Sequence, residues 1–112
     1  MRNIDSLKNS SQFKEVYENG KSFANKLLVL YVLKKDGEEK KLGISASKKI
    51  GNSVVRHRTV RLIRESFLVV KDKLPKGCCL VIVARPQIAG KKQSDVTEAL
   101  LHLCRLHKLI KQ

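Results

Sequence analysis

Several features that mark common protein classes are missing from this sequence. It contains no run of roughly 18 apolar residues, so we expect no membrane-spanning helix. The first residues lack the apolar segment of a secretory signal peptide, which makes the cytoplasm the expected location. The cysteines lack C-x-x-C spacing and the histidines form no ligand pattern, so we expect no metal site on the protein.

Motifs of protein catalysis are also missing. The chain has no acid pair at useful spacing, no Ser-His-Asp signature, no H-E-x-x-H and no phosphate-binding glycine loop. Ser45 and Ser47 lie beside Lys48, but this is a weak nucleophile candidate. The residues alone therefore predict a binding module without catalytic residues.

Aromatic side chains are scarce, at 4% of the residues. Phe13, Tyr17 and Tyr31 are among those that precede the most basic part of the chain. An exposed ring beside a basic groove can stack on an unpaired base, which contributes about 1–3 kcal/mol. The alternative is core packing, which the periodicity favours for Phe13.

Positive charge is abundant, with 24 Lys/Arg against 10 Asp/Glu and a net charge of +14. The charge is concentrated: residues 1–20 are balanced, whereas no acidic residue occurs from Lys48 until Glu65. Such a one-sided excess in a chain of 112 residues favours a nucleic-acid or anionic-surface partner.

The basic segment has the periodicity of a helix that begins near Gly51. At about 100° per residue, its cations share one side, and Thr59, Leu62, Ile63, Ser66, Phe67 and Val70 share the other. Arg56 and Arg58 lie in the first turns, where the helix dipole disfavours a cation by roughly 0.3–1 kcal/mol. A bound polyanion would reverse the sign of that effect, so the pattern indicates RNA binding rather than a merely solvated face.

The order of the other elements indicates an α+β domain. Apolar runs predict strands over 27–34, 41–47 and 78–84, the last covered on both faces, and an additional short strand between residues 20 and 30 stays open. Helical periodicity marks residues 10–19, 51–73 and 95–110. We expect one RNA-binding domain over residues 1–112, a two-layer sandwich of a four-stranded sheet and three helices.

The segment SASKKIGNSVVRHRTVRLIRESF resembles the signature of the protein subunit of bacterial ribonuclease P. That family carries Lys-Lys-x-Gly-Asn-Ala-Val-x-Arg-Asn-Arg-x-Lys-Arg followed by Leu-Ile-Arg. FKEVYENGKSFANKLLVLYVL and CLVIVARP are similar to its first helix and strand and to its last strand. The resemblance therefore covers nearly the whole chain.

The resemblance implies an accessory subunit of a ribonucleoprotein endonuclease. Proteins of this family bind the catalytic RNA subunit, which removes the 5′ leader of precursor tRNA and leaves a 5′-phosphate on the mature tRNA. It implies magnesium as cofactor, bound mainly through the RNA, with no membrane and no obligate protein partner. It also implies a left-handed β-α-β crossover, although the general rule predicts the right-handed form.

Two groups of site residues follow from the resemblance. The family's basic loop and helix, which contact the RNA subunit, correspond here to Lys48, Lys49, Asn52, Arg56, His57, Arg58, Arg61 and Arg64. The family's cleft for the single-stranded leader corresponds to Phe13, Tyr17, Tyr31, Ser45 and Lys48.

Two alternatives to the ribonuclease P role stay open at this point. A non-catalytic structural RNA-binding protein of ribosomal type would have the same composition, and only the pattern from Lys48 to Arg64 separates the two. A self-sufficient protein nuclease is disfavoured, because metal-binding carboxylates are missing near the basic segment.

The chain departs from the family pattern at His57, which replaces asparagine, and at Val60, which replaces lysine. Histidine titrates between about pH 5 and 8, so we expect the RNA affinity to be retained but to vary with pH over that range. Titrating the RNA subunit at several pH values measures this. A profile that is flat, and that His57→Asn leaves unchanged, would contradict the expectation.

Overall fold

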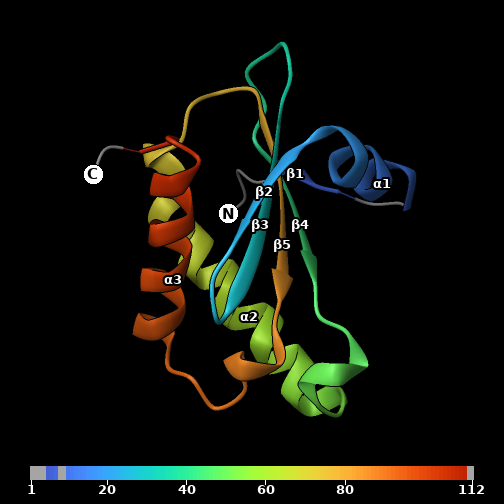
Figure 1. Ribbon diagram of the computed structural model, residues 1–112, viewed down its shortest axis with the longest axis vertical. Helices are drawn as coiled ribbons and strands as arrows, with labels where there is room; N and C mark the ends of the chain where they lie inside the picture. Colours follow the sequence, from blue (N-terminus) through green and yellow to red (C-terminus); the bar gives the residue numbers. More distant parts are fainter. Residues whose placement is uncertain (1–4, 8–9, 111–112) are drawn as a thin grey trace.

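The computed structural model describes residues 5–7 and 10–110 and alternates short strands with three helices (Figure 1). The predicted domain also includes residues 1–4, 8–9 and 111–112, which lie outside the described part. The elements are β1 (Asp5–Ser6), α1 (Ser10–Asn19), β2 (Lys21–Ala24), β3 (Leu28–Lys34), β4 (Lys41–Ser45), η1 (Lys48–Ile50), α2 (Ser53–Val70), η2 (Lys71–Lys73), β5 (Cys78–Ala84), η3 (Pro86–Ile88) and α3 (Gln93–Leu106).

The strands form one mixed sheet in the order β1-β4-β5-β3-β2. The three predicted strands are confirmed, and the open question between residues 20 and 30 is answered by β2, which pairs antiparallel with β3. β4 ends at Ser45, two residues earlier than predicted, because Ser47 Oγ accepts a hydrogen bond from Lys49 N and caps η1. The sequence did not indicate the two-residue β1 at the β4 edge.

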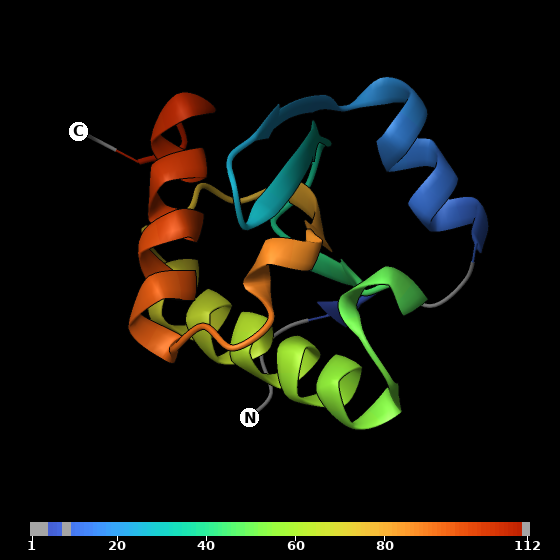
Figure 2. The ribbon, with the colours of Figure 1, turned by 60° about the horizontal axis from the view of Figure 1, so that its bottom comes forward.

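The connection from β4 through α2 to β5 joins two neighbouring parallel strands. In Figure 1 both strands point down, α2 passes behind them and β5 lies to the left of β4. Figure 2 agrees, with α2 and α1 on opposite sides of the sheet. The crossover is therefore left-handed, as the family resemblance implied and against the general preference.

The main core lies between the sheet and the α2–α3 pair. The predicted apolar face of α2 is confirmed: Ile63, Phe67 and Val70 are fully buried, and Leu62 is half-buried. Burial of each large apolar side chain contributes roughly 1.5–3 kcal/mol. The buried Ser66 keeps its hydroxyl satisfied through a 2.9 Å hydrogen bond with Thr97 Oγ1 of α3, which also fixes how the two helices face each other.

A second, smaller cluster covers part of the opposite face of the sheet. Val16 of α1 is buried against Val81 and Cys79 of β5, which confirms that β5 is covered on both faces. α1 is the only described helix on this face, and it crosses only part of it (Figure 2). The remaining face is open to solvent beside α1.

The three cysteines are free and buried, as expected for Cys78 and Cys79. Burial raises the pKa of Cys104 to about 11 and raises that of Cys78. At neutral pH both thiols therefore stay protonated and act as small apolar side chains in the core. None of the helices in the described part is both long and apolar enough to cross a membrane.

His107 makes stability depend on pH. Its Nε2 donates to Leu30 O at 2.8 Å, since a carbonyl can only accept, and burial lowers its pKa below the usual value. The folded state therefore favours the neutral ring, and stability is lost as the pH falls from about 6.5 toward the folded pKa.

We expect His107→Gln to flatten the fall in melting temperature between pH 7.5 and 5.5. The exposed His102 provides the control, and an equal flattening by His102→Gln would contradict this assignment.

Candidate nucleic-acid interface

The start of α2 is defined by two local features. Asn52 Oδ1 accepts a hydrogen bond from Val55 N at 3.0 Å and caps the helix. Gly51 has a φ of 153°, and a Cβ there would lie 3.0 Å from the side chain of Val55. The oxygen of Asn52 is therefore committed to the fold, and only its exposed amide NH₂ is free for the predicted RNA contact.

The predicted basic surface is present on α2 as an exposed face. His57, Arg58, Arg61 and Arg64 are exposed, and Lys48 and Lys49 continue the exposed charge onto η1. We call these four α2 residues the arginine face. None of them shares an ion pair with another described residue, so their charges are available to a partner.

Arg56 differs from the arginine face. It lies about 60° around the helix from the buried Thr59 and about 140° from Arg61. It is half-buried, and its Nε is buried without a hydrogen-bond partner among the described residues. Arg56 therefore lies at the margin between the core and the arginine face, which the periodicity alone did not show.

The ion pairs between lysines and carboxylates lie away from the arginine face. The five ion pairs of the described residues are Lys14–Glu18, Lys35–Glu15, Lys41–Glu39, Lys71–Asp72 and Lys76–Glu38. All involve α1, the β3–β4 connection or the segment between α2 and β5. The five acidic residues in these pairs thus lie away from the arginine face, and Glu65, which follows Arg64 on α2, is in none of the pairs.

The three predicted cleft aromatics come together between α1 and β3. The rings of Tyr17 and Tyr31 meet edge to face with centroids 4.8 Å apart, and Phe13 lies 6.3 Å from Tyr17. A Cβ on Gly43 would lie 2.7 Å from the Phe13 ring, so the missing side chain lets this ring settle on β4. Phe13 thus packs in the second cluster, whereas Tyr17 stays 39% exposed.

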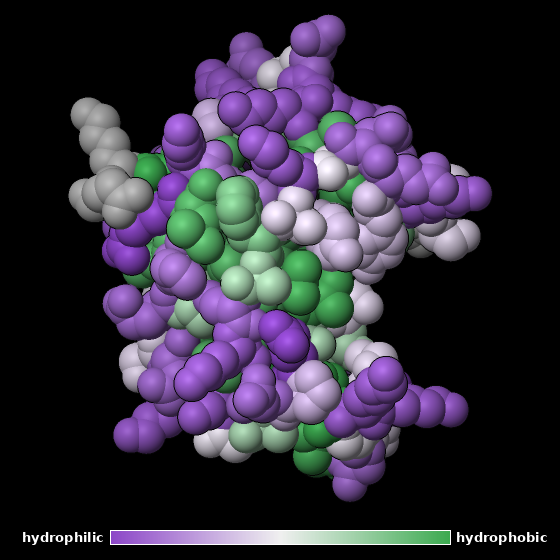
Figure 3. Space-filling view, viewed as in Figure 1, coloured by the Kyte–Doolittle hydropathy of each residue, from purple (hydrophilic) through white to green (hydrophobic). Residues whose placement is uncertain are grey.

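Ser45 extends this surface along β4, and Lys48 follows in η1, three residues after the strand ends. Ser45 is paired in register with Val83 of β5, and Val83 with Val29 of β3, so these side chains share the face that carries Tyr31. Figure 3 shows apolar side chains reaching the surface over the middle of this view, among hydrophilic ones. Val29 and Val83 form an open floor that the sequence analysis missed, although the alternation Cys79–Val81–Val83 could have indicated it.

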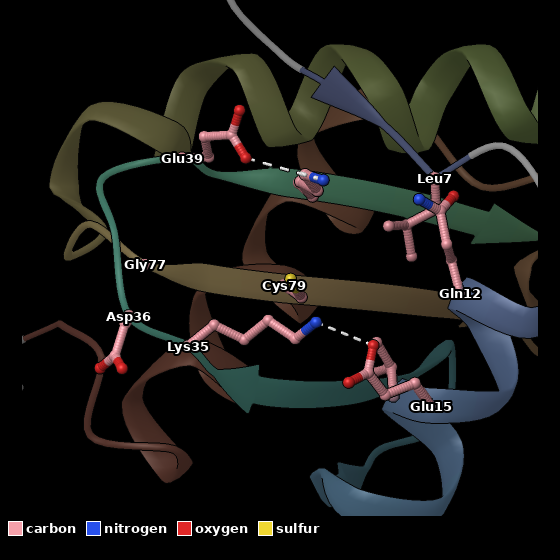
Figure 4. Close-up of a pocket in the computed structure, with 10 residues that line it drawn as sticks. Leu7, Gln12, Glu15, Lys35, Asp36, Glu39, Gly77 and Cys79 are labelled. Atoms are coloured by element: carbon pink, nitrogen blue, oxygen red, sulfur yellow. Dashed lines mark hydrogen bonds and ion pairs between the residues drawn. The ribbon is translucent and has the colours of Figure 1, made fainter.

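A separate pocket of about 250 Å³ lies on the other flank of α1, toward the β3–β4 connection (Figure 4). Its floor includes Leu7, Val16 and Cys79, and the ion pair Lys35–Glu15, at 2.8 Å, closes one side. The hydrogen bond that Lys35 Nζ donates to Glu15 Oε1 raises the pKa of Lys35. None of the predicted cleft residues lines this pocket, so it is distinct from the cleft.

Metal-ligating side chains are dispersed in this protein. Within residues 5–7 and 10–110, no three His, Cys, Asp or Glu residues lie close enough together to hold a metal ion. The guanidinium and ammonium groups of this surface are of the kind that binds phosphate, and its exposed tyrosine is of the kind that stacks on an unpaired base.

Comparisons with known proteins show to which family the chain is similar. The family model for Ribonuclease P matches residues 1–108. The ribonuclease P protein component of Lachnoclostridium phytofermentans is 57% identical over 106 residues, which cover 95% of this chain and 91% of the relative. That of Alkaliphilus metalliredigens is 40% identical, covering 98% and 99%.

Solved structures show the same fold. The Staphylococcus aureus RNase P protein matches with a TM-score of 0.85 and 30% identity, covering 95% of this chain and 97% of that one. The Thermotoga maritima RNase P protein matches with a TM-score of 0.80 and 28% identity, covering 96% and 99%. The fold, the basic surface and these relatives together lead to one conclusion: the chain belongs to the ribonuclease P protein family.

Proposed function

We propose that this chain binds the catalytic RNA of ribonuclease P and the 5′ leader of precursor tRNA, and so assists removal of the leader. The observation that carries the proposal is the meeting of two surfaces at Lys48. One is the arginine face of α2, and the other is the aromatic cleft between α1 and β3.

The arginine face suits the RNA subunit. Its exposed guanidinium groups have no acidic partners among the described residues, so RNA phosphates would not have to displace one. Lys48, Lys49, Asn52 and Arg56 border this face and belong to the proposed contact. Binding should therefore be strongly salt-dependent, because each neutralised phosphate releases counterions.

The cleft suits a single strand. Its open floor on β3 and β5 and the exposed edge of Tyr17 offer apolar and aromatic surface to unpaired bases, while Ser45 and Lys48 offer polar groups to the backbone. A duplex would pair these bases with each other and leave the tyrosines without a partner.

We further propose that the RNA subunit carries the chemistry. The described side chains offer no cluster fit to hold magnesium, so the protein supplies binding and orientation, and magnesium would act where the RNA holds it. The product is mature tRNA with a 5′-phosphate. We also propose a cytoplasmic location for this chain.

The decisive experiment compares cleavage of precursor tRNA at low magnesium with and without the cognate RNA subunit. We expect the protein to stimulate cleavage only when the RNA is present. No stimulation would refute the proposal and favour the structural RNA-binding alternative. Cleavage by the protein alone would favour a self-sufficient nuclease.

The arginine face can be tested by its salt dependence. Arg61→Ala and Arg64→Ala should each weaken binding of the RNA subunit and reduce the slope of log K against log salt by about one. Filter binding between 50 and 400 mM salt measures the slope. Lys73→Ala removes one exposed cation beyond the end of α2 and serves as the control. Equal slopes for the three variants would contradict a specific role of this face.

The cleft can be tested by comparing substrates. Tyr31→Ala should weaken binding of leader-bearing precursor tRNA by about 1–3 kcal/mol, one stacked base, and leave mature tRNA nearly unchanged. Tyr31→Phe should retain most of the affinity, because it keeps the ring. Leu33→Ala is the matched control, since Leu33 packs in the same cluster from the same strand. Equal losses on both substrates would reject the cleft assignment.

A further inference from the structure

A second group of unpaired cations adjoins the arginine face. Lys91 and Lys92 lie in the connection between η3 and α3, and both side chains are exposed. Figure 2 shows this connection running beside α2 to the start of α3. Arg58 Nη2 donates to Lys91 O at 3.4 Å, which holds the connection against the arginine face. We call Arg58, Lys91 and Lys92 the basic corner.

The position of Lys92 is unfavourable for the fold itself. It occupies the N-cap of α3, where side-chain acceptors are preferred and the helix dipole disfavours a cation. Asp95, in the first turn of α3, accepts a hydrogen bond from Lys92 N at 3.1 Å through its Oδ2, and the ammonium group of Lys92 has no ion-pair partner among the described residues. Neither Lys91 nor Lys92 has an ion-pair partner among the described residues.

The start of α2 also carries cations at a helix N-terminus, where the helix dipole disfavours them, and it lies at the same end of the molecule. Arg56 and Arg58 lie in its first turns, and no acidic residue lies there. Cations at the N-terminal ends of two neighbouring helices are unfavourable for stability. Such repeated departures at one place indicate a functional surface, because a bound anionic partner offsets the unfavourable charge. The lysines near the β3–β4 connection differ from those of the basic corner, since Lys35, Lys41 and Lys76 are paired with acids.

We infer that the basic corner is a second contact for the phosphate backbone of the RNA subunit, extending the arginine face across to α3. This inference rests on the proposed function. RNA phosphate is the occupant that the corner fits, because its three side chains are all cationic, none is in an ion pair with a described residue, and it continues the surface assigned to that RNA. Arg58 joins the two contacts through its hydrogen bond to Lys91.

The test uses the double variant Lys91→Ala/Lys92→Ala with the full-length RNA subunit. We expect binding about tenfold weaker at 0.15 M salt and a salt slope less steep by about 1.4, the value for two phosphate contacts. The melting temperature should stay equal or rise, because the N-cap of α3 loses a cation. Lys91→Arg/Lys92→Arg should retain the affinity.

The double variant Lys73→Ala/Lys76→Ala is the control for net charge, since it also removes two exposed lysines, of which Lys76 pairs with Glu38. We expect it to change the affinity less than twofold. Equal weakening by both double variants would mean an effect of net charge and would overturn the inference. Unchanged binding by the Lys91/Lys92 variant, while Arg61→Ala still weakens it, would overturn the inference but leave the proposed function intact.

Footprinting of the RNA provides an independent readout. Nucleotides that lose protection in the Lys91/Lys92 variant should neighbour those that lose protection in Arg58→Ala. Loss at scattered sites would overturn the inference. Failure of the wild-type protein to bind the RNA subunit better than an unrelated structured RNA would instead refute the proposed function, and the inference with it.

Discussion

The parallel pairing of β4 with β5 is the constraint on which both proposed RNA-binding surfaces, the arginine face and the aromatic cleft, depend. Two parallel neighbours require a crossover that returns the chain along the sheet, and α2 makes that return while burying one side against the core. The start of α2 must then follow the end of β4 closely. Lys48 lies at this junction, so a single short connection carries the chain from the cleft to the arginine face.

The ion pairs of this small domain lie in one region, and the unpaired cations lie in another. Exposed ion pairs contribute little each, roughly 0–1 kcal/mol, so pairing the acids around α1 and the β3–β4 connection adds only modestly to stability. Its larger effect is on the surface potential. The arginine face and Lys91 and Lys92 keep their charge unneutralised within the described residues, and a polyanion is attracted to one side of the molecule.

Much of this structure could be predicted from local patterns, and the remainder depends on contacts distant in sequence. The apolar run of β5 and the period of α2 were sufficient, because β5 is buried along nearly its whole length and α2 buries one regular face. The residues alone could not show the hand of the crossover, which the family resemblance supplied. The half-burial of Arg56, the open floor at Val29 and Val83, and the strand β1 result from packing and pairing between elements distant in sequence. The assignment of residues to the RNA subunit or the leader stays a prediction.

The shape of the cleft depends on a residue that contributes no side chain. Phe13 reaches β4 only because Gly43 leaves room for its ring, which would lie 2.7 Å from a Cβ. Val16 is buried one turn further along α1, so these two contacts fix the height of the helix above the sheet. Tyr17 follows on the same helix and is thereby held edge to face against Tyr31. A larger residue at position 43 would lift α1 and separate the two tyrosines, so the width of the cleft is set from beneath the helix.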